Sequence, residues 1–261
     1  MAFKLPFKLD FNLDKIFGKI KRKDMKKNIL VDIGLYLRHL IIQHKTTAYT
    51  ILAIIGVLII ATPIYLKNYY DKVNEANTYF EYGLGAYRKA LSDPELSPEE
   101  RANQMGESIK RFQYVINQFS NTPPAADALF YQGHAYYDLG DYNNALNKYQ
   151  EYYDRYSKKY FADLALLNVG RCNEQLNNFQ GAVQAYQKII HEYPKGTAKA
   201  EALFQLGKIH ELSNAINQAF QYYNQLINEH PQSPWAREAR MRVLFIQSQV
   251  RPEAKPIPEG K

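Results

Sequence analysis

Ala128-Leu129-Phe130-Tyr131-Gln132-Gly133 returns in related form as Ala165-Leu166-Leu167-Asn168-Val169-Gly170 and as Ala202-Leu203-Phe204-Gln205-Leu206-Gly207. The glycines that close these three stretches are 37 residues apart in both intervals. A fixed period of a few tens of residues is the sequence signature of a repeat architecture. The sequence therefore predicts three copies of one structural unit that follow one another along the chain.

Each copy continues with further shared positions after its glycine. Alanine follows the glycine by 12 residues and tyrosine follows it by 16, and then come an apolar pair and a helix breaker. In chain order these residues are Ala145, Tyr149, Tyr152, Tyr153 and Ser157; Ala182, Tyr186, Ile189, Ile190 and Pro194; and Ala219, Tyr223, Leu226, Ile227 and Pro231. A short polar turn separates glycine from alanine, so each unit is expected to fold as helix, turn, helix and stop. Glycine and alanine would let the two helices approach closely, while the tyrosine fills the gap to the next unit.

The two ends of the array depart from this pattern. Upstream, residues 79–83 are expected to belong to the first helix of another unit. Its glycine, Gly83, lies 50 residues before Gly133, so this unit is 13 residues longer than the period of 37. The extra residues are placed in 92–101, where Ser97-Pro98-Glu99-Glu100 predicts a capped helix start. The residues that fit the second helix of this unit are Ser108, Phe112, Val115 and Ile116. Downstream, residues 235–250 are expected to form a solvating end helix, and residues 251–261, with three prolines, a disordered tail.

Residues 46–66 form an uncharged run of 21 residues between Lys45 and Lys67. That length suits one helical crossing of a hydrocarbon core of about 30 Å. Ten of the 21 residues are Leu, Ile or Val, which favours insertion by about 3 to 6 kcal/mol. A cleaved signal peptide would begin near the first residue and end at small residues. The sequence therefore predicts a transmembrane helix that is kept as an anchor.

Charge is unevenly distributed around this apolar run. Residues 1–46 hold 11 Lys and Arg against four Asp, and the rest of the chain holds 22 basic and 22 acidic residues. Because basic residues are retained in the cytoplasm, residues 1–45 are predicted to be a basic cytoplasmic segment, with residues 67–250 outside the cytoplasm. In a bacterium with two membranes, the helix would lie in the inner membrane and the repeats in the periplasm.

The basic segment has more than one possible structure. Residues 3–14 alternate between apolar and polar with period two, which suits an extended strand that pairs with a partner's sheet edge. Alternatively, the segment is a mobile tail held near anionic lipid by the cluster Lys21–Lys27. Nucleic-acid binding would need basic groups on a folded platform, so no nucleic-acid partner is predicted.

The pattern of leucine, glycine, alanine, aromatic residue and proline resembles the tetratricopeptide repeat (TPR) family over residues 125–234. The resemblance implies an all-α fold, a TPR-type helical-hairpin solenoid over residues 67–250 that follows a single transmembrane helix. It also implies that the first helix of each unit lines a concave groove that binds proteins. The groove positions implied by the family register are Phe130, His134, Tyr137, Leu167, Arg171, Glu174, Phe204, Lys208 and Glu211.

The chain offers no pattern typical of a catalytic or metal site. Its six histidines lack metal-ligand spacing, and His210-Glu211 lacks the second histidine of a zincin helix. The single cysteine, Cys172, cannot form an internal disulfide and is expected to pack inside a helix. We therefore predict no enzyme activity, no cofactor and no bound metal.

The order of the parts, a basic start, one anchor helix and a periplasmic repeat array, resembles the ancillary subunit of the bacterial Sec translocon. That resemblance implies an adaptor that brings emerging chains or periplasmic chaperones to the translocation channel. The repeats alone also look like the lipoprotein of the Bam complex and the cell-division coordinator of the Tol-Pal system, which are exported with cleaved signals. The alternative is a structural scaffold within an envelope secretion, outer-membrane assembly or motility complex. In either case the partners are other proteins, namely translocon, chaperone or envelope-complex subunits.

Overall fold

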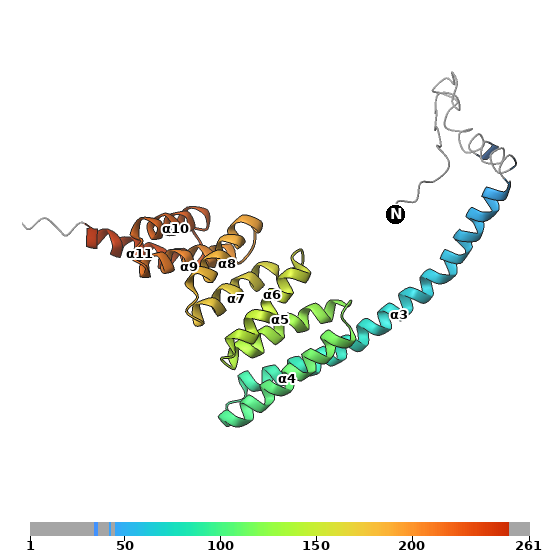
Figure 1. Ribbon diagram of the computed structural model, residues 1–261, viewed down its shortest axis with the longest axis horizontal. Coiled ribbons are helices and arrows are strands. Elements are labelled where there is room, and N and C mark those ends of the chain that lie inside the picture. Colours follow the sequence, from blue (N-terminus) through green and yellow to red (C-terminus); the bar gives the residue numbers. More distant parts are fainter. Residues whose placement is uncertain (1–33, 36–41, 43–44, 251–261) are drawn as a thin grey trace, which may run out of the picture. The chain divides into compact units, whose positions relative to one another are not determined.

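The computed structural model describes residues 34–35, 42 and 45–250. The regular structure of this part is helical throughout, which confirms the predicted all-α class (Figure 1). The helices are α3 (Lys45–Ser92), α4 (Pro98–Gln118), α5 (Pro123–Asp138), α6 (Tyr142–Tyr156), α7 (Ala162–Gln175), α8 (Phe179–Glu192), α9 (Lys199–Leu212), α10 (Ile216–Glu229) and α11 (Pro234–Val250). The chain divides into two compact units, Met1–Asn68 and Tyr69–Lys261. The predictions for the period-two segment, for Lys21–Lys27 and for the tail 251–261 lie outside the described residues.

Helix α3 contains the apolar run. Within the described residues, the helical segment Tyr49–Ser92 is long and apolar enough to cross a membrane, with an 18-residue window of mean hydropathy 2.2 that is not buried against other parts of the protein. The helix does not end with the apolar run, as the sequence analysis expected, but continues to Ser92. No glycine or proline occurs between Pro63 and Gly83 to stop the helix, and Gly83 and Gly85 lie within it. The first helix of the first repeat unit is therefore the second half of α3.

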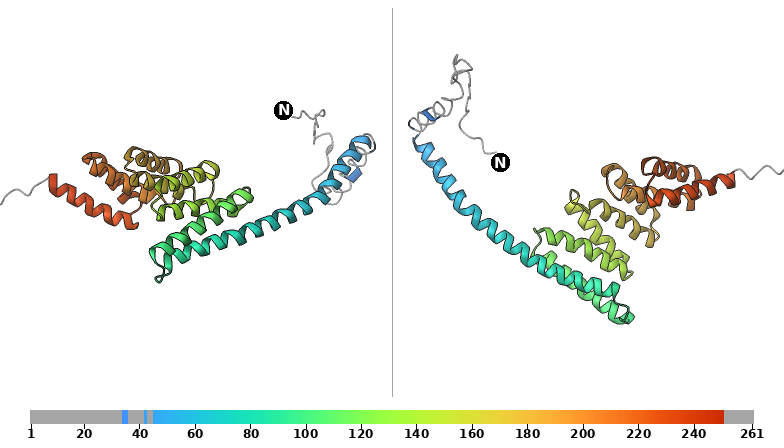
Figure 2. Two further views of the ribbon diagram at one scale, coloured as in Figure 1. Left: turned by 60° about the horizontal axis from the view of Figure 1, so that its bottom comes forward. Right: turned by 180° about the vertical axis from the view of Figure 1, so that it is seen from behind.

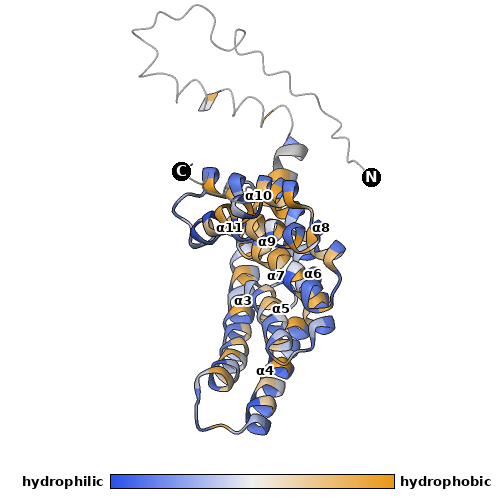
Figure 3. Ribbon diagram, turned by 90° about the vertical axis from the view of Figure 1, so that its left-hand side faces the viewer, coloured by the Kyte–Doolittle hydropathy of each residue, from blue (hydrophilic) through white to orange (hydrophobic). Residues whose placement is uncertain are grey.

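From Tyr69 onward the helices form hairpins, each helix packing against the next one in the chain, and α9 also packs against α11 (Figures 1 and 2). The first helices of the four units are the second half of α3, then α5, α7 and α9, and we call these the A helices. The second helices are α4, α6, α8 and α10, which we call the B helices. Hydrophobic and hydrophilic positions alternate along these helices (Figure 3), because each one buries a stripe against its neighbours and leaves the opposite side in water.

A glycine in the A helix and a tyrosine in the B helix determine how closely the two pack. A Cβ atom on Gly170 would lie 2.2 Å from the ring of Tyr186, and similar overlaps would occur at the equivalent pairs, Gly133 with Tyr149 and Gly207 with Tyr223. The rings of these tyrosines are at most 1% exposed. The structure corrects one detail of the prediction: each ring covers the glycine of its own unit, whereas the sequence analysis assigned it to the gap between units.

The first unit keeps this arrangement with different residues. A Cβ atom on Gly83 would meet the ring of Phe112 at 2.9 Å, so phenylalanine takes the place of tyrosine. The extra residues of this unit lengthen the end of α3 and the start of α4, and residues 93–97 connect the two helices. The capped start of α4 is confirmed: Oγ of Ser97 accepts from the backbone N–H of Glu100 at 3.3 Å, and the Glu100 carboxylate accepts from the backbone N–H of Ser97 at 2.9 Å.

The turns from A to B helices share one backbone feature. Gly140, Asn177 and Asn214 occupy equivalent positions and have φ values of 78°, 57° and 61°. This left-handed conformation ends a helix and suits glycine or asparagine better than other residues. The turn residues thus fix where each B helix starts, and so which residues of the two helices meet.

Candidate protein-interaction surfaces

Three of the nine predicted groove residues belong to the core. Phe130, Leu167 and Phe204 occupy equivalent positions on α5, α7 and α9, and they are only 5%, 2% and 7% exposed. Phe130 stacks on Phe161 with ring centroids 4.7 Å apart, and Phe204 packs against Trp235 at 5.2 Å. A partner cannot reach these side chains in this conformation. They support the A-helix face from beneath, so the prediction needs correcting at these positions.

The two groove positions of α5 that follow Phe130 are partly buried. Nδ1 of His134 lies 2.9 Å from the hydroxyl oxygen of Tyr149. Burial lowers the pKa of the His134 imidazole, which favours its neutral form. The ring of Tyr137 packs against Tyr142 with centroids 5.1 Å apart. This part of the A-helix face is therefore aromatic and uncharged at neutral pH.

The charged groove positions of α7 and α9 bind one another across the two helices. Nζ of Lys208 lies 3.0 Å from Oε2 of Glu174, whose other oxygen accepts from the hydroxyl of Tyr186 at 2.5 Å. Arg171 donates to Oε1 of Glu201 at 2.5 Å. Two ion pairs thus connect neighbouring A helices. With their continuation toward α11, these residues form what we call the ionic ladder: Arg171, Glu174, Glu201, Lys208, Glu211 and Arg242.

The ladder ends on α11. The carboxylate of Glu211 accepts from the hydroxyl of Tyr223 at 2.8 Å and lies 3.5 Å from Nη1 of Arg242. In each ion pair of the ladder the carboxylate is more buried than the cation. In the pair of Glu174 with Lys208, for example, the two side chains are 15% and 33% exposed. Partly exposed pairs contribute about 0 to 1 kcal/mol each. The four charged groove predictions thus lie together on the A-helix face, and these four residues and His134 already have ion-pair or hydrogen-bond partners within the protein.

Helix α11 carries an exposed apolar face that was not predicted from the sequence. Met241, Leu244 and Phe245 are 63%, 60% and 55% exposed, whereas the prediction for this segment was a solvating end helix. Their spacing of three and four residues places them on one side of the helix. Arg237 and Arg240, one turn before Met241 and Leu244, are exposed as well. The i, i+3, i+4 pattern was visible in the sequence and could have revealed this face.

Helix α11 follows the register of an A helix. Moving 37 residues on from α9 leads from Ala202 to Ala239, which are both fully buried, and from Ile209 to Ile246, which are both 6% exposed. At the glycine position, however, α11 has Leu244. In α9 the corresponding surface is covered by the B helix of the same unit. In α11, within the described residues, no B helix follows, so the surface is open.

Comparison with family models identifies the array. A model described as tetratricopeptide repeat matches residues 99–159 and 132–197, and a second model with the same description matches residues 201–233. These matches run from α4 to α10, so they include the three units that share the 37-residue period and the second helix of the first unit. The chain carries tetratricopeptide repeats. A comparison with curated proteins by sequence found no match.

Several solved structures are similar to the tetratricopeptide array. The crystal structure of the apo form of RapI is similar with a TM-score of 0.51 at 16% identity, over 69% of this chain and 48% of that chain. A tetratricopeptide repeat protein from Parabacteroides merdae ATCC 43184 has a TM-score of 0.45 at 18% identity, over 70% and 75% of the two chains. The MamA protein has a TM-score of 0.47 at 17% identity, over 70% and 98%. At 16% identity, the likeness to RapI concerns the fold alone.

Tetratricopeptide repeats are generally non-catalytic scaffolds for protein-protein interaction. Among the residues that the structure describes, no group of three or more His, Cys, Asp or Glu side chains could hold a metal ion. Cys172 is fully buried, as predicted, and burial raises the pKa of its thiol to about 12. A thiol in this environment is a packing group and not a reactive one. The features of the array that can act on other molecules are therefore its surfaces.

Proposed function

We propose that this protein is a membrane-anchored adaptor whose tetratricopeptide array holds another protein at the inner membrane. The observation that carries the proposal is the joining of two features in one chain. Helix α3 supplies an apolar window that is not buried against the rest of the protein, and the repeats that follow are an interaction fold. The excess of basic residues before the helix supports a cytoplasmic N-terminus and a periplasmic array.

The partner in this proposal is an amphipathic helix of another protein, docked on the open face of α11. Each inner A helix has a B helix on the equivalent surface, so this surface has the geometry to receive a helix. Arg237 and Arg240 beside the face favour acidic residues along the edges of the incoming helix. Leu244 stands where Gly207 accepts a tyrosine ring, so the partner needs a small residue opposite Leu244.

The array's place in the cell envelope is inferred from the order of its parts. An adaptor for protein translocation or for periplasmic chaperones is the specific function that we infer from the resemblance to the ancillary Sec subunit. The alternative is a scaffold in an envelope secretion, outer-membrane assembly or motility complex. The two differ in their partners, because an adaptor handles many client chains while a scaffold keeps one fixed subunit.

Topology is tested by cysteine labelling in cells. A single cysteine at Leu212, which is 74% exposed, should react with an impermeant maleimide when only the outer membrane is opened, and a cysteine at Lys4 should react only after lysis. Labelling at Lys4 without lysis would contradict the proposed orientation. The chain should also stay in the membrane after alkaline carbonate extraction, and its release would contradict anchoring by α3.

The adaptor and the scaffold are distinguished by photocrosslinking from Tyr137 in membranes, followed by mass spectrometry. Tyr137 is a suitable position because it is partly exposed on the A-helix face, unlike the buried Phe204. Many secreted chains together with translocon subunits support the adaptor. A single envelope protein at fixed stoichiometry contradicts the adaptor and makes this protein a dedicated scaffold.

A further inference from the structure

The two edges of the repeat array differ in charge. The loops that lead from a B helix to the next A helix contain three lysines and no acidic residue, whereas those from an A helix to its B helix contain three acidic residues and no basic one. The charged loop residues are Lys158, Lys159 and Lys195 on the first edge, and Asp93, Glu95 and Asp141 on the second. Both kinds of loop join a helix C-terminus to a helix N-terminus. The preference of helix ends for one sign of charge therefore acts alike on both and does not explain the difference.

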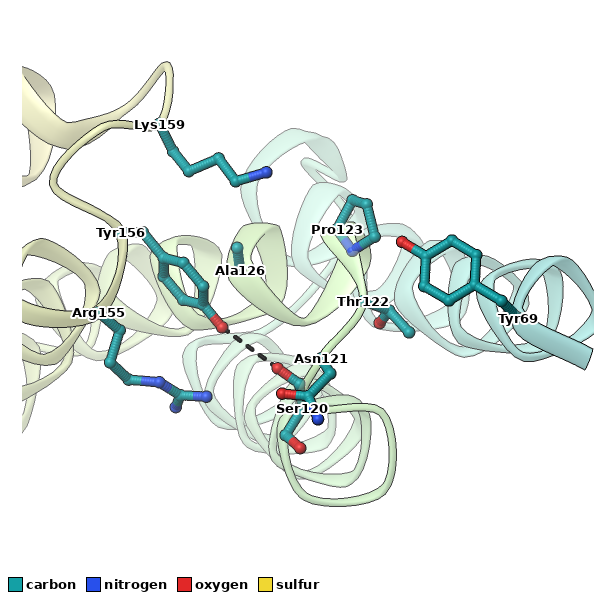
Figure 4. A pocket seen from close by; sticks show the side chains of 9 residues that line it. All are labelled: Tyr69, Ser120, Asn121, Thr122, Pro123, Ala126, Arg155, Tyr156 and Lys159. Carbon is teal, nitrogen blue, oxygen red and sulfur yellow. Dashed lines mark hydrogen bonds between the residues drawn. The ribbon is translucent and has the colours of Figure 1, made fainter. Parts of the chain in front are cut away.

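The basic edge includes a cavity near the end of the apolar run. Its volume is about 470 Å³, and Lys159 and Arg155 border it together with Tyr69 (Figure 4). Tyr69 is the first residue of the repeat unit and follows Leu66, the last apolar residue, by three positions. Three residues of chain span at most about 10 Å. Chain connectivity alone therefore keeps this cavity close to the point where α3 would leave the membrane.

The cavity's polar groups face its opening. In Figure 4 the ammonium of Lys159 is directed toward the first turn of α5, and the guanidinium of Arg155 reaches toward Asn121. Arg155 also pairs with Glu151 at 2.8 Å, and its side chain is 37% exposed. The hydroxyl of Tyr156 donates to the carbonyl oxygen of Ser120 at 3.4 Å across the same opening. The two cations remain accessible from the solvent side.

The loop beside the cavity has the composition of a membrane-surface segment. Tyr160 is 80% exposed, more than any other exposed large hydrophobic residue of the described part, and Lys158 and Lys159 precede it directly. Tyrosine rings favour the headgroup level of a bilayer. Lysines near an anionic surface are attracted within a Debye length.

We propose that residues 155–160 bind the phosphates of anionic lipid headgroups beside the exit of α3, and so give the repeat array a fixed orientation on the membrane surface. This inference rests on the membrane anchoring proposed above. The ligand chemistry is a phosphate group at a bilayer surface. Lys158, Lys159 and Arg155 contact the phosphates, and the ring of Tyr160 inserts among the headgroups.

The test uses the full chain in lipid nanodiscs with a fluorophore on a cysteine at residue 160. Native Cys172 does not compete for the label, because it is fully buried and its thiol pKa is raised to about 12. The matched control is a cysteine at Leu212, which is 74% exposed on the acidic edge. We expect a headgroup-attached quencher to quench position 160 severalfold more than position 212 in discs containing phosphatidylglycerol. Lys158→Gln with Lys159→Gln should lower the surface-bound population about fivefold per lysine.

Equal quenching at the two positions, or the same quenching in discs of phosphatidylcholine alone, would overturn the inference. Inorganic phosphate added to phosphatidylcholine discs distinguishes the two sources of phosphate. A change at position 160 with free phosphate alone would show a soluble-anion site and overturn the lipid assignment. If the chain enters the discs and position 160 is not quenched, only this inference fails. If the chain does not enter the discs at all, the proposed anchoring fails with it.

Discussion

Helices α9 and α11 have the same register, and among the described residues only α9 has a B helix packed on its glycine face. In α9, Gly207 lies under the ring of Tyr223, and the neighbouring Phe204 is 7% exposed. In α11, Leu244 stands at the glycine position, and Met241 at the phenylalanine position is 63% exposed. The difference shows that the repeat period fixes which side of a helix is apolar, while the residue at the glycine position decides whether a tyrosine-bearing helix can cover it.

The largest expected effect on stability comes from leucine, the residue that α11 has at the glycine position, when it replaces the glycine of an inner unit. Gly170→Leu would bring side-chain atoms into the ring of Tyr186, because even a Cβ atom would lie 2.2 Å away. Overpacking of this kind costs about 3 kcal/mol or more. Urea unfolding of the protein in detergent, followed by circular dichroism, measures the loss. The control is Gly106→Ala, where no atom lies within 4 Å of the added Cβ, and unchanged stability of Gly170→Leu would contradict the close packing.

The second effect concerns the hydrogen bond that joins the tyrosine to the ionic ladder. Tyr186→Phe removes the hydroxyl that donates to Glu174 at 2.5 Å, while the ring and its packing remain. Since the acceptor is a carboxylate, we expect a loss of about 1.5 to 3 kcal/mol. The same unfolding measurement applies. Tyr160→Phe, at a residue that is 80% exposed, is the matched control and should leave stability unchanged. Equal losses of stability for the two substitutions would contradict a stabilising hydrogen bond between Tyr186 and Glu174.

A smaller effect depends on pH and on His134. Burial lowers the imidazole pKa in the folded protein below the unfolded value of 6.5. The unfolded chain therefore binds the proton more readily, and the stability that is present above pH 6.5 declines as the pH falls toward the folded pKa. We therefore expect the protein to be less stable at pH 5 than at pH 7. Thermal unfolding of His134→Gln should show a weaker acid dependence than the native protein, and an identical dependence would contradict the assignment.

The smallest effect on stability is expected on α11 itself. Leu244→Ala and Phe245→Ser change side chains that are 60% and 55% exposed, so the free energy of unfolding should change by no more than about 0.5 kcal/mol. Recovery of the partner from membranes should nevertheless fall sharply, because these side chains form the docking face. Leu212→Ser, at a 74% exposed position away from that face, should leave recovery unchanged. If the α11 variants recover as much of the partner as the native protein does, this face is not the docking site.

The fold could be predicted because the repeat is strict. Glycine, alanine and tyrosine at fixed spacing determined the hairpins, since each has a packing role that no other residue fills equally well. The depth of each side chain could not be predicted in the same way. Family register placed Phe130, Leu167 and Phe204 on the groove side, but whether they lie on the surface or beneath it depends on rings such as Phe161 and Trp235 from neighbouring elements.

Two other features escaped the sequence analysis for different reasons. The continuation of α3 to Ser92 was missed because the end of the apolar run was taken as the end of the helix, although nothing in residues 67–82 stops a helix. The ionic ladder was missed because its partners are more than 25 residues apart, as Arg171 and Glu201 are. Spacing within one helix gives no information about such pairs.

The central claim is that the open face of α11 receives a helix from another protein, and crosslinking from Phe245 tests it most directly. A photoreactive residue replaces Phe245 in the full chain, in native membranes, and mass spectrometry maps the crosslinked peptide. The account predicts one adduct, in an amphipathic helical segment of another protein with acidic edges and a small residue opposite Leu244, which disappears with Leu244→Asp. A crosslink to α11 of a second copy, or no protein adduct, would contradict it.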